Sequence, residues 1–173
     1  ITKISSTTDP IDAVLEGLDK AGVKLEDVSL FSHGTTVATN ALIERNLPHT
    51  ALVTTEGFRD IIEIGNATKE DLWDAYKDNP SAYIRRRDRL TISECVLADG
   101  KLEKPVNESQ AQELARVLKK RDYKAIAICF MNSYANPANE LWLKEYLQNL
   151  LPSVAISTSA EVLPEIFEHE RFS

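Results

Sequence analysis

Ala125-Ile126-Ala127-Ile128-Cys129-Phe130-Met131 is an almost entirely apolar run. A short, continuous apolar segment of this kind is typical of a strand that helices cover on both faces of a parallel sheet. A helical pattern stands on either side of it. Asn107 can cap the first helix, whose apolar residues recur at helical spacing: Ala111, Leu114, Ala115 and Leu118. Asn136-Pro137 opens the second helix, which carries Leu141, Leu143, Tyr146, Leu147 and Leu150.

Strands and helices continue to alternate outward from this unit. Three more segments have strand character: Val28–Ser32, Ala51–Thr54 and Val154–Ser157. Helices are predicted over five further ranges: Pro10–Gly22, Val37–Asn46, Phe58–Ile64, Thr68–Tyr76 and Glu161–Ser173. Such alternation predicts βαβ units and a mainly parallel sheet, which places the chain in the α/β class.

One segment interrupts this alternation. Leu90–Leu97 and Lys101–Val106 are predicted to be extended, and Asp99-Gly100 between them is a strong hairpin signal. We therefore predict an antiparallel hairpin insertion over residues 84–106, which the core does not need, in a single domain over residues 1–173. Because the chain starts at Ile1 rather than Met and a charged helical pattern runs into Ser173, we expect it to be truncated at both ends.

Composition excludes several classes of function. The net charge of -7 and pI of about 5.0 argue against a nucleic-acid surface, which needs Lys and Arg to displace counterions. The basic run Arg85–Arg89 is interpreted as a solvated strand edge. The two cysteines, Cys95 and Cys129, suggest neither a disulfide framework nor a metal site, and no apolar run is long enough to span a bilayer. We therefore expect a cytoplasmic protein that binds neither nucleic acid nor membrane.

Small polar residues follow each predicted strand. These loops are Ser32–Thr36, Thr54–Gly57, Asn132–Asn136 and Ser157–Glu161. In open parallel sheets, ligands bind beyond the carboxyl ends of the strands. The repetition of hydroxyl and amide side chains therefore predicts a binding site along this one edge of the sheet.

The first of these loops has the most specific pattern. Gly34 permits a close backbone approach, and a helix that starts at Thr35 or Thr36 offers free N–H groups and hydroxyls to an anion. His33 can donate to that anion or act as a general acid or base, and Asn40 lies one turn further on the same helix face as Thr36. The alternative is that both threonines only cap the helix and His33 is a satisfied loop residue. Glu56 and Asp60, after the second strand, can contact a substrate or favour a helix start.

Several segments together resemble one protein family. His33-Gly34-Thr35-Thr36 with Asn40, and Thr54-Thr55-Glu56-Gly57-Phe58-Arg59-Asp60, look like motifs of the hydantoinase A/oxoprolinase family in its N-terminal region. Asn132–Pro137 and Ser159–Ile166 also match, in the same order. That family includes 5-oxoprolinases, N-methylhydantoinases and subunits of acetone and acetophenone carboxylases.

The resemblance implies an actin-like ATPase half-domain, the architecture of sugar kinases and Hsp70. It implies a parent enzyme that uses ATP and Mg²⁺ to phosphorylate a cyclic amide or small carbonyl substrate for hydrolysis or carboxylation. The family's site residues can be carried over to the matching positions of this sequence. The candidate catalytic residues are then His33, Thr35 and Thr36. The candidates for binding substrate or phosphate are Gly34, Asn40, Glu56 and Asp60. The implied partners are a small-molecule substrate, the rest of the chain and a second enzyme subunit. The fragment alone is expected to hold no cofactor and to be inactive. The alternative is a non-catalytic binding or assembly module.

Overall fold

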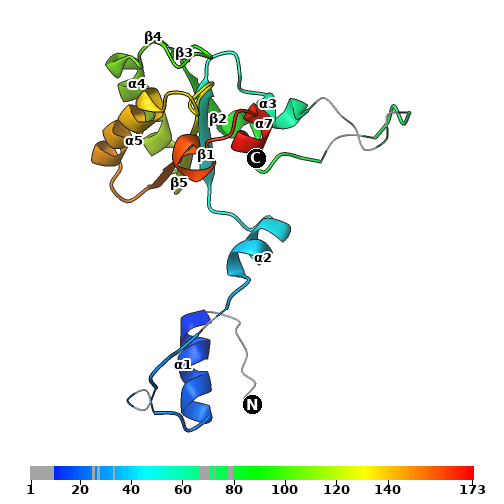
Figure 1. Cartoon of the computed structure of the whole chain (residues 1–173), viewed down its shortest axis with the longest axis vertical. Helices are drawn as coiled ribbons and strands as arrows, with labels where there is room; N and C mark the ends of the chain where they lie inside the picture. Colours follow the sequence, from blue (N-terminus) through cyan, green and yellow to red (C-terminus); the bar gives the residue numbers. More distant parts are fainter. Residues whose placement is uncertain are drawn as a thin grey trace. The chain divides into compact units, whose positions relative to one another are not determined.

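The computed structural model describes residues 10–24, 26, 28–32, 34–66, 71, 73–77 and 80–173. The chain divides into two compact units, Ile1–Asn40 and Ala41–Ser173. The larger unit holds every described strand, and it determines the fold of the protein (Figure 1).

The smaller unit contains α1 (Pro10–Lys20), as predicted from its apolar spacing. Gly22 ends this helix with a φ of 67°, and the Val23 N–H donates to the Leu18 carbonyl at 3.0 Å. The predicted strand over Val28–Ser32 is wrong, because these residues form no strand. Leu30 is 85% exposed, and an apolar run forms a strand only where a neighbouring strand pairs with it.

The larger unit is built on a four-stranded parallel sheet in the order β2-β1-β5-β6. Its strands are β1 (Thr50–Thr55), β2 (Arg89–Ile92), β5 (Ala125–Cys129) and β6 (Ala155–Thr158). β1 pairs with β2 and β5, and β5 pairs with β1 and β6. The apolar run therefore forms an interior strand, as predicted.

Helices cover both faces of this sheet (Figure 1). On one face α4 (Glu108–Lys120) and α5 (Ala138–Leu150) enclose the larger core with inward side chains of the sheet such as Val53, Ile126 and Ile128. On the other face the smaller core lies at Leu52, Cys129 and Phe172, beside the short helices α3 (Ile61–Ile64) and α7 (Glu168–Phe172). The predicted cap of α4 is confirmed, since the Asn107 side chain accepts from the Ser109 N–H at 2.9 Å.

The antiparallel hairpin is shorter than predicted. Asp99-Gly100 does turn between β3 (Cys95–Val96) and β4 (Leu102–Lys104), with Gly100 at a φ of 83°. Leu90–Ile92, however, belongs to β2 and pairs in parallel with β1. The interpretation of these residues as a hairpin arm is therefore wrong. The physical reason is that the edge of β1 provides a longer set of backbone partners than β4 does.

Three predicted helices also differ from the structure. In the segment Thr68–Tyr76, the described residues Asp71 and Trp73–Lys77 form turns, in which Asp71 and Asp74 accept from backbone N–H groups two residues on. The predicted helix over Glu161–Ser173 is interrupted. It consists of α6 (Ser159–Val162) and α7, because Pro164 between them cannot supply the N–H of a continuous helix. The helix predicted over Phe58–Ile64 is confined to α3, and Gly65 ends it.

Candidate functional site

The predicted anion site lies at the start of α2 (Val37–Ile43). Thr35 Oγ1 accepts from the Val37 N–H at 3.3 Å, and the Thr36 carbonyl accepts from the Asn40 N–H at 2.8 Å. Gly34, both threonines and Asn40 are exposed. A Cβ added at Gly34 would meet nothing within 4 Å, so the chain's own packing does not require glycine there. His33 lies outside the described residues.

This arrangement supports the capping alternative for Thr35, whose hydroxyl is already engaged with the helix that follows. The placement of Gly34–Thr36 directly after a strand is wrong, because the described residues 28–32 before them form no strand. Their role in binding an anion stays a prediction.

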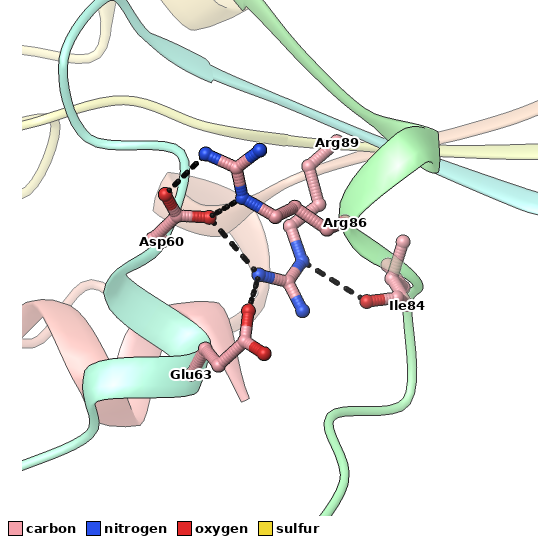
Figure 2. A network of polar contacts seen from close by, with 5 residues as sticks. All are labelled: Asp60, Glu63, Ile84, Arg86 and Arg89. Atoms are coloured by element: carbon pink, nitrogen blue, oxygen red, sulfur yellow. Dashed lines mark hydrogen bonds and ion pairs between the residues drawn. The ribbon is translucent and has the colours of Figure 1, made fainter.

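Asp60 lies beyond the end of β1 in a network of charged groups (Figure 2). Its carboxylate accepts from Arg86 Nε and Nη2, each at 2.9 Å. This two-point hydrogen bond from Arg86 holds the pKa of Asp60 below its usual range. The Asp60 carboxylate is therefore occupied by the protein itself. Glu56 is exposed, and its backbone N–H donates to the Ile92 carbonyl at 3.0 Å.

Arg89 completes this network from the first residue of β2. Its Nη1 donates to Glu63 at 2.6 Å and to Asp60 at 3.4 Å, and its Nε donates to the Ile84 carbonyl at 3.0 Å (Figure 2). Only 3% of Arg89 is exposed, so the interpretation of the basic run as a solvated edge is wrong for this residue. The sequence does not reveal the role of Arg89, because only the folded chain brings Asp60 and Glu63 to it.

A second polar cluster lies at the carboxyl ends of β1, β5 and β6. Glu140, in the first turn of α5, is fully buried. Its carboxylate accepts from the Phe130 N–H and the Ser159 hydroxyl, both at 2.7 Å, and from the Ala160 N–H at 2.9 Å. The Ser133 hydroxyl lies 3.0 Å from that of Ser159. One carboxylate thus joins the loop after β5 to the loop after β6.

Glu94, between β2 and β3, joins the remaining loops of this edge. It is 4% exposed, accepts from the Thr55 hydroxyl through Oε1, and accepts from Asn139 Nδ2 at 2.7 Å. Thr55 Oγ1 in turn accepts from the Met131 N–H at 2.9 Å. Burial raises the pKa of Glu94, and the nearby Glu140 carboxylate adds to that rise.

The structure therefore gathers three of the four predicted polar loops on one edge. Two amides of the loop after β5 also anchor it to the hairpin: Asn132 donates to the Val96 carbonyl at 2.8 Å and Asn136 to the Gly100 carbonyl at 2.9 Å. Sequence reasoning missed Glu94, Asn139 and Glu140. A signal existed for Glu94, because it stands in alternation with Ile92 and Val96, and all three are buried.

A cavity of about 850 Å³ opens on the α3 and α7 face of the larger unit. The cavity is lined by apolar side chains, among them Ile62, Ile84 and Phe172, and by polar side chains, among them Arg45 and His49. Among the described residues there is no group of three or more His, Cys, Asp and Glu side chains that could hold a metal ion. No helix in the described part of the chain is long and apolar enough to cross a membrane.

Residues 1–151 match the family described as the hydantoinase/oxoprolinase N-terminal region. The chain is 35% identical to an uncharacterized protein of Methanocaldococcus jannaschii, covering 100% of this chain and 26% of that protein. It is 30% identical to the acetophenone carboxylase gamma subunit of Aromatoleum aromaticum, covering 93% of this chain and 24% of the subunit.

The caprolactamase of Pseudomonas jessenii is similar in both sequence and structure. Its alpha subunit is 32% identical over 86% of this chain and 22% of the subunit. The crystal structure of this ATP-dependent caprolactamase superposes with a TM-score of 0.80 at 28% identity, covering 97% of this chain and 25% of that one. The predicted fold class, an α/β half-domain of the actin-like ATPase type, is confirmed. The chain spans about a quarter of the length of these relatives.

Proposed function

The chain belongs to the hydantoinase/oxoprolinase family, and from that premise we propose that its parent protein is an ATP-dependent enzyme. The parent activates a cyclic amide or a small carbonyl compound by phosphorylation, in preparation for hydrolysis or carboxylation. The observation that carries this proposal is the likeness, over nearly the whole chain, to a solved enzyme described as an ATP-dependent caprolactamase. We place the parent in the cytoplasm, because Cys95 and Cys129 are free cysteines and thiols stay reduced in that compartment.

The substrate lies, in this proposal, beyond the carboxyl ends of β1 and β5. The polar loops converge there, and Glu94 and Glu140 hold those loops through hydrogen bonds. Glu56 is exposed at the end of β1, where its carboxylate can meet a ligand. Asp60 acts indirectly, because Arg86 already engages its carboxylate and fixes the start of α3.

The described residues do not by themselves fit ATP and Mg²⁺. α2 is seven residues long, Thr35 uses its hydroxyl on the helix, and no acidic cluster for a metal ion occurs in the described ranges. In the proposal His33, Gly34, Thr36 and Asn40 contribute one side of a site that other parts of the parent complete. The 173-residue chain alone is then inactive.

The test is turnover by the full-length parent. It should release ADP from Mg-ATP only in the presence of one substrate among 5-oxoproline, a hydantoin, caprolactam, acetone and acetophenone. Dependence of ADP release on bicarbonate would identify carboxylation, and independence would identify hydrolysis. Absence of substrate-dependent ADP release with every compound, from a folded parent with its partner subunits, would contradict the proposal.

A second candidate function is a non-catalytic module for subunit assembly. Two relatives are named as subunits, alpha and gamma, and an open cavity of about 850 Å³ lies on the α3 and α7 face. Under this alternative, substitutions on that face, such as Ile64→Glu, separate the subunits, while substitutions at His33 or Thr36 leave turnover of the assembled enzyme unchanged. Ile64 is 60% exposed, so its replacement tests contact rather than folding.

A further inference from the structure

Two buried carboxylates lie side by side at the carboxyl edge, and their environments differ. The donors that Glu140 and Glu94 have are uncharged, and burying a carboxylate without a positively charged partner is costly. Two of the three donors to Glu140 are backbone N–H groups. Both donors to Glu94 are side chains. Glu140 therefore supports the backbone directly, whereas Glu94 orients two other side chains.

One of those side chains stands at the junction of two loops. Thr55 is the last residue of β1, and the loop with Glu56 follows it. Its hydroxyl hydrogen is directed to Glu94, which leaves its oxygen free to accept the Met131 N–H at 2.9 Å. Met131 opens the loop after β5. The carboxylate of Glu94 thus sets the direction of a hydrogen bond that ties the β1 loop to the β5 loop.

The second side chain that Glu94 orients is Asn139. Its Nδ2 donates both to Glu94 at 2.7 Å and to the Lys104 carbonyl at 3.1 Å, while its Oδ1 accepts from the Val106 N–H at 3.1 Å. Glu94 therefore joins the hairpin and the start of α5 to the same junction. Glutamine has the same shape as glutamate but carries one acceptor oxygen and one NH₂ group. A glutamine at position 94 therefore cannot accept hydrogen bonds from both Thr55 and Asn139.

We propose that Glu94 is a positioning residue of the active site, which holds the β1 and β5 loops at the spacing that the substrate requires. This inference rests on the proposed function, in which the substrate binds at that edge. The carboxylate form of Glu94 is the working form, because it alone satisfies both donors.

Protonation of Glu94 then loosens the junction. Burial raises the pKa of Glu94, and Glu140 from α5 raises it further. Lys104 of β4 belongs to the same junction, because its carbonyl accepts from Asn139, and its Nζ donates to the Ser93 hydroxyl at 2.6 Å. Glu56, which follows Thr55, is exposed. Turnover should fall on the acid side as Glu94 takes up a proton.

The first test uses the full-length parent with Mg-ATP and its substrate. Glu94→Gln should lower kcat about tenfold and should remove the acid limb from the pH profile of kcat, since the variant has no proton to gain at this position. Glu145→Gln, at an exposed position of α5, is the matched control and should leave both unchanged. An active parent whose Glu94→Gln variant keeps the wild-type kcat and pH profile would overturn the inference and leave the proposed function intact.

The second test does not depend on activity. Amide hydrogen exchange on the 173-residue chain should show faster exchange at Met131 in Glu94→Gln and unchanged exchange at Phe130, which Glu140 holds. Thr55→Val should reproduce the effect at Met131, and Thr55→Ser, which retains the hydroxyl, should not. Unchanged exchange at Met131 in Glu94→Gln would overturn the inference even if the parent turned over none of the candidate substrates.

Discussion

Arg89 Nη1 lies 2.6 Å from the Glu63 carboxylate, and this contact links the first residue of an edge strand to the short helix α3. The arginine is buried, whereas its acidic partners Glu63 and Asp60 are partly open to water. The network therefore fastens α3, η2 (Arg86–Asp88) and β2 to one another on the side of the sheet with the smaller core. Asp60, which the family resemblance makes a site candidate, helps to hold the end of β1 in place.

Removing Arg89 should destabilise the larger unit. Arg89→Ala leaves the Ile84 carbonyl without its donor and separates α3 from β2, so we expect a loss of about 1–3 kcal/mol of unfolding free energy. The loss stays below that of a fully buried pair, because Glu63 and Asp60 can be solvated. Urea unfolding of the 173-residue chain measures it. Arg116→Ala, on the exposed face of α4, should cost under about 0.5 kcal/mol and serves as the control. Equal urea midpoints for the two variants would contradict this role for Arg89.

Glu94 should lower the unfolding free energy as pH rises. A carboxylate paired with a positive charge does the opposite, because its folded-state pKa is lowered. Its folded-state pKa is raised by burial, so the folded protein binds this proton more tightly than the unfolded chain does. The stabilisation is fully present below the unfolded pKa and is lost as pH rises through the folded pKa. The unfolding free energy of wild type relative to Glu94→Gln should therefore decrease as pH rises above the ordinary pKa of a glutamate, about 4.3. A difference that rises with pH, in urea titrations of both proteins, would mean that the carboxylate is stabilised in the fold.

The hairpin of β3 and β4 should tolerate shortening, whereas deletion of the longer segment that also contains β2 should not be tolerated. Replacing Leu97–Lys101 with a two-residue Asn-Gly turn keeps β3 and β4 paired, so cooperative thermal unfolding should persist. Deleting Asp88–Lys104 removes β2, Arg89 and Glu94 together, and should abolish the cooperative transition. We therefore expect the core to need the first part of the segment over residues 84–106. A retained transition after the larger deletion would show that the edge strand contributes little.

The helix start of α2 offers a matched pair of threonines. The Thr35 hydroxyl caps the helix, so Thr35→Val should lower stability by about 1 kcal/mol. Thr36 contributes its carbonyl to the helix and exposes its side chain, so Thr36→Val, like His33→Ala, should lower turnover of the parent at least tenfold with stability nearly unchanged. A preorganised donor to developing charge is worth roughly 2.7–4 kcal/mol in a dry site. A drop in melting temperature at Thr36→Val with wild-type turnover per folded molecule would support the capping role for both threonines.

The sequence predicts those parts of the fold that depend on local pattern. The interior strand Ala125–Cys129 has a continuous apolar run, and α4 combines helical spacing with a capping Asn107, so both are confirmed with nearly correct bounds. Val28–Ser32 has a similar composition and forms no strand, because strand formation depends on a pairing partner that the local pattern does not specify. The turn residues Asp71 and Asp74 likewise replace a helix that residue spacing alone favours.

The site shows the same division. The three polar loops at the edge of the sheet follow from strand order and were predictable. Arg89, Glu94 and Glu140 were not singled out, because charged residues are usually solvated and their burial here depends on partners far away in the sequence. For Glu94 the alternation with Ile92 and Val96 carried the information. The role of Glu94 depends on its hydrogen bonds from Thr55 and Asn139, and only the folded chain brings these residues together.

The order of strands in the sheet also determines when the protein can fold during synthesis. Among the described strands β1 comes first in the chain, and both of its neighbours, β2 and β5, come much later. Its apolar residues Ala51, Leu52 and Val53 therefore leave the ribosome before either partner strand, and the edge of β1 that pairs with β5 stays open until residues 125–129 emerge. Such long-range pairing slows folding and exposes the nascent chain to aggregation, so among the described strands β1 gives a chaperone the longest opportunity to bind.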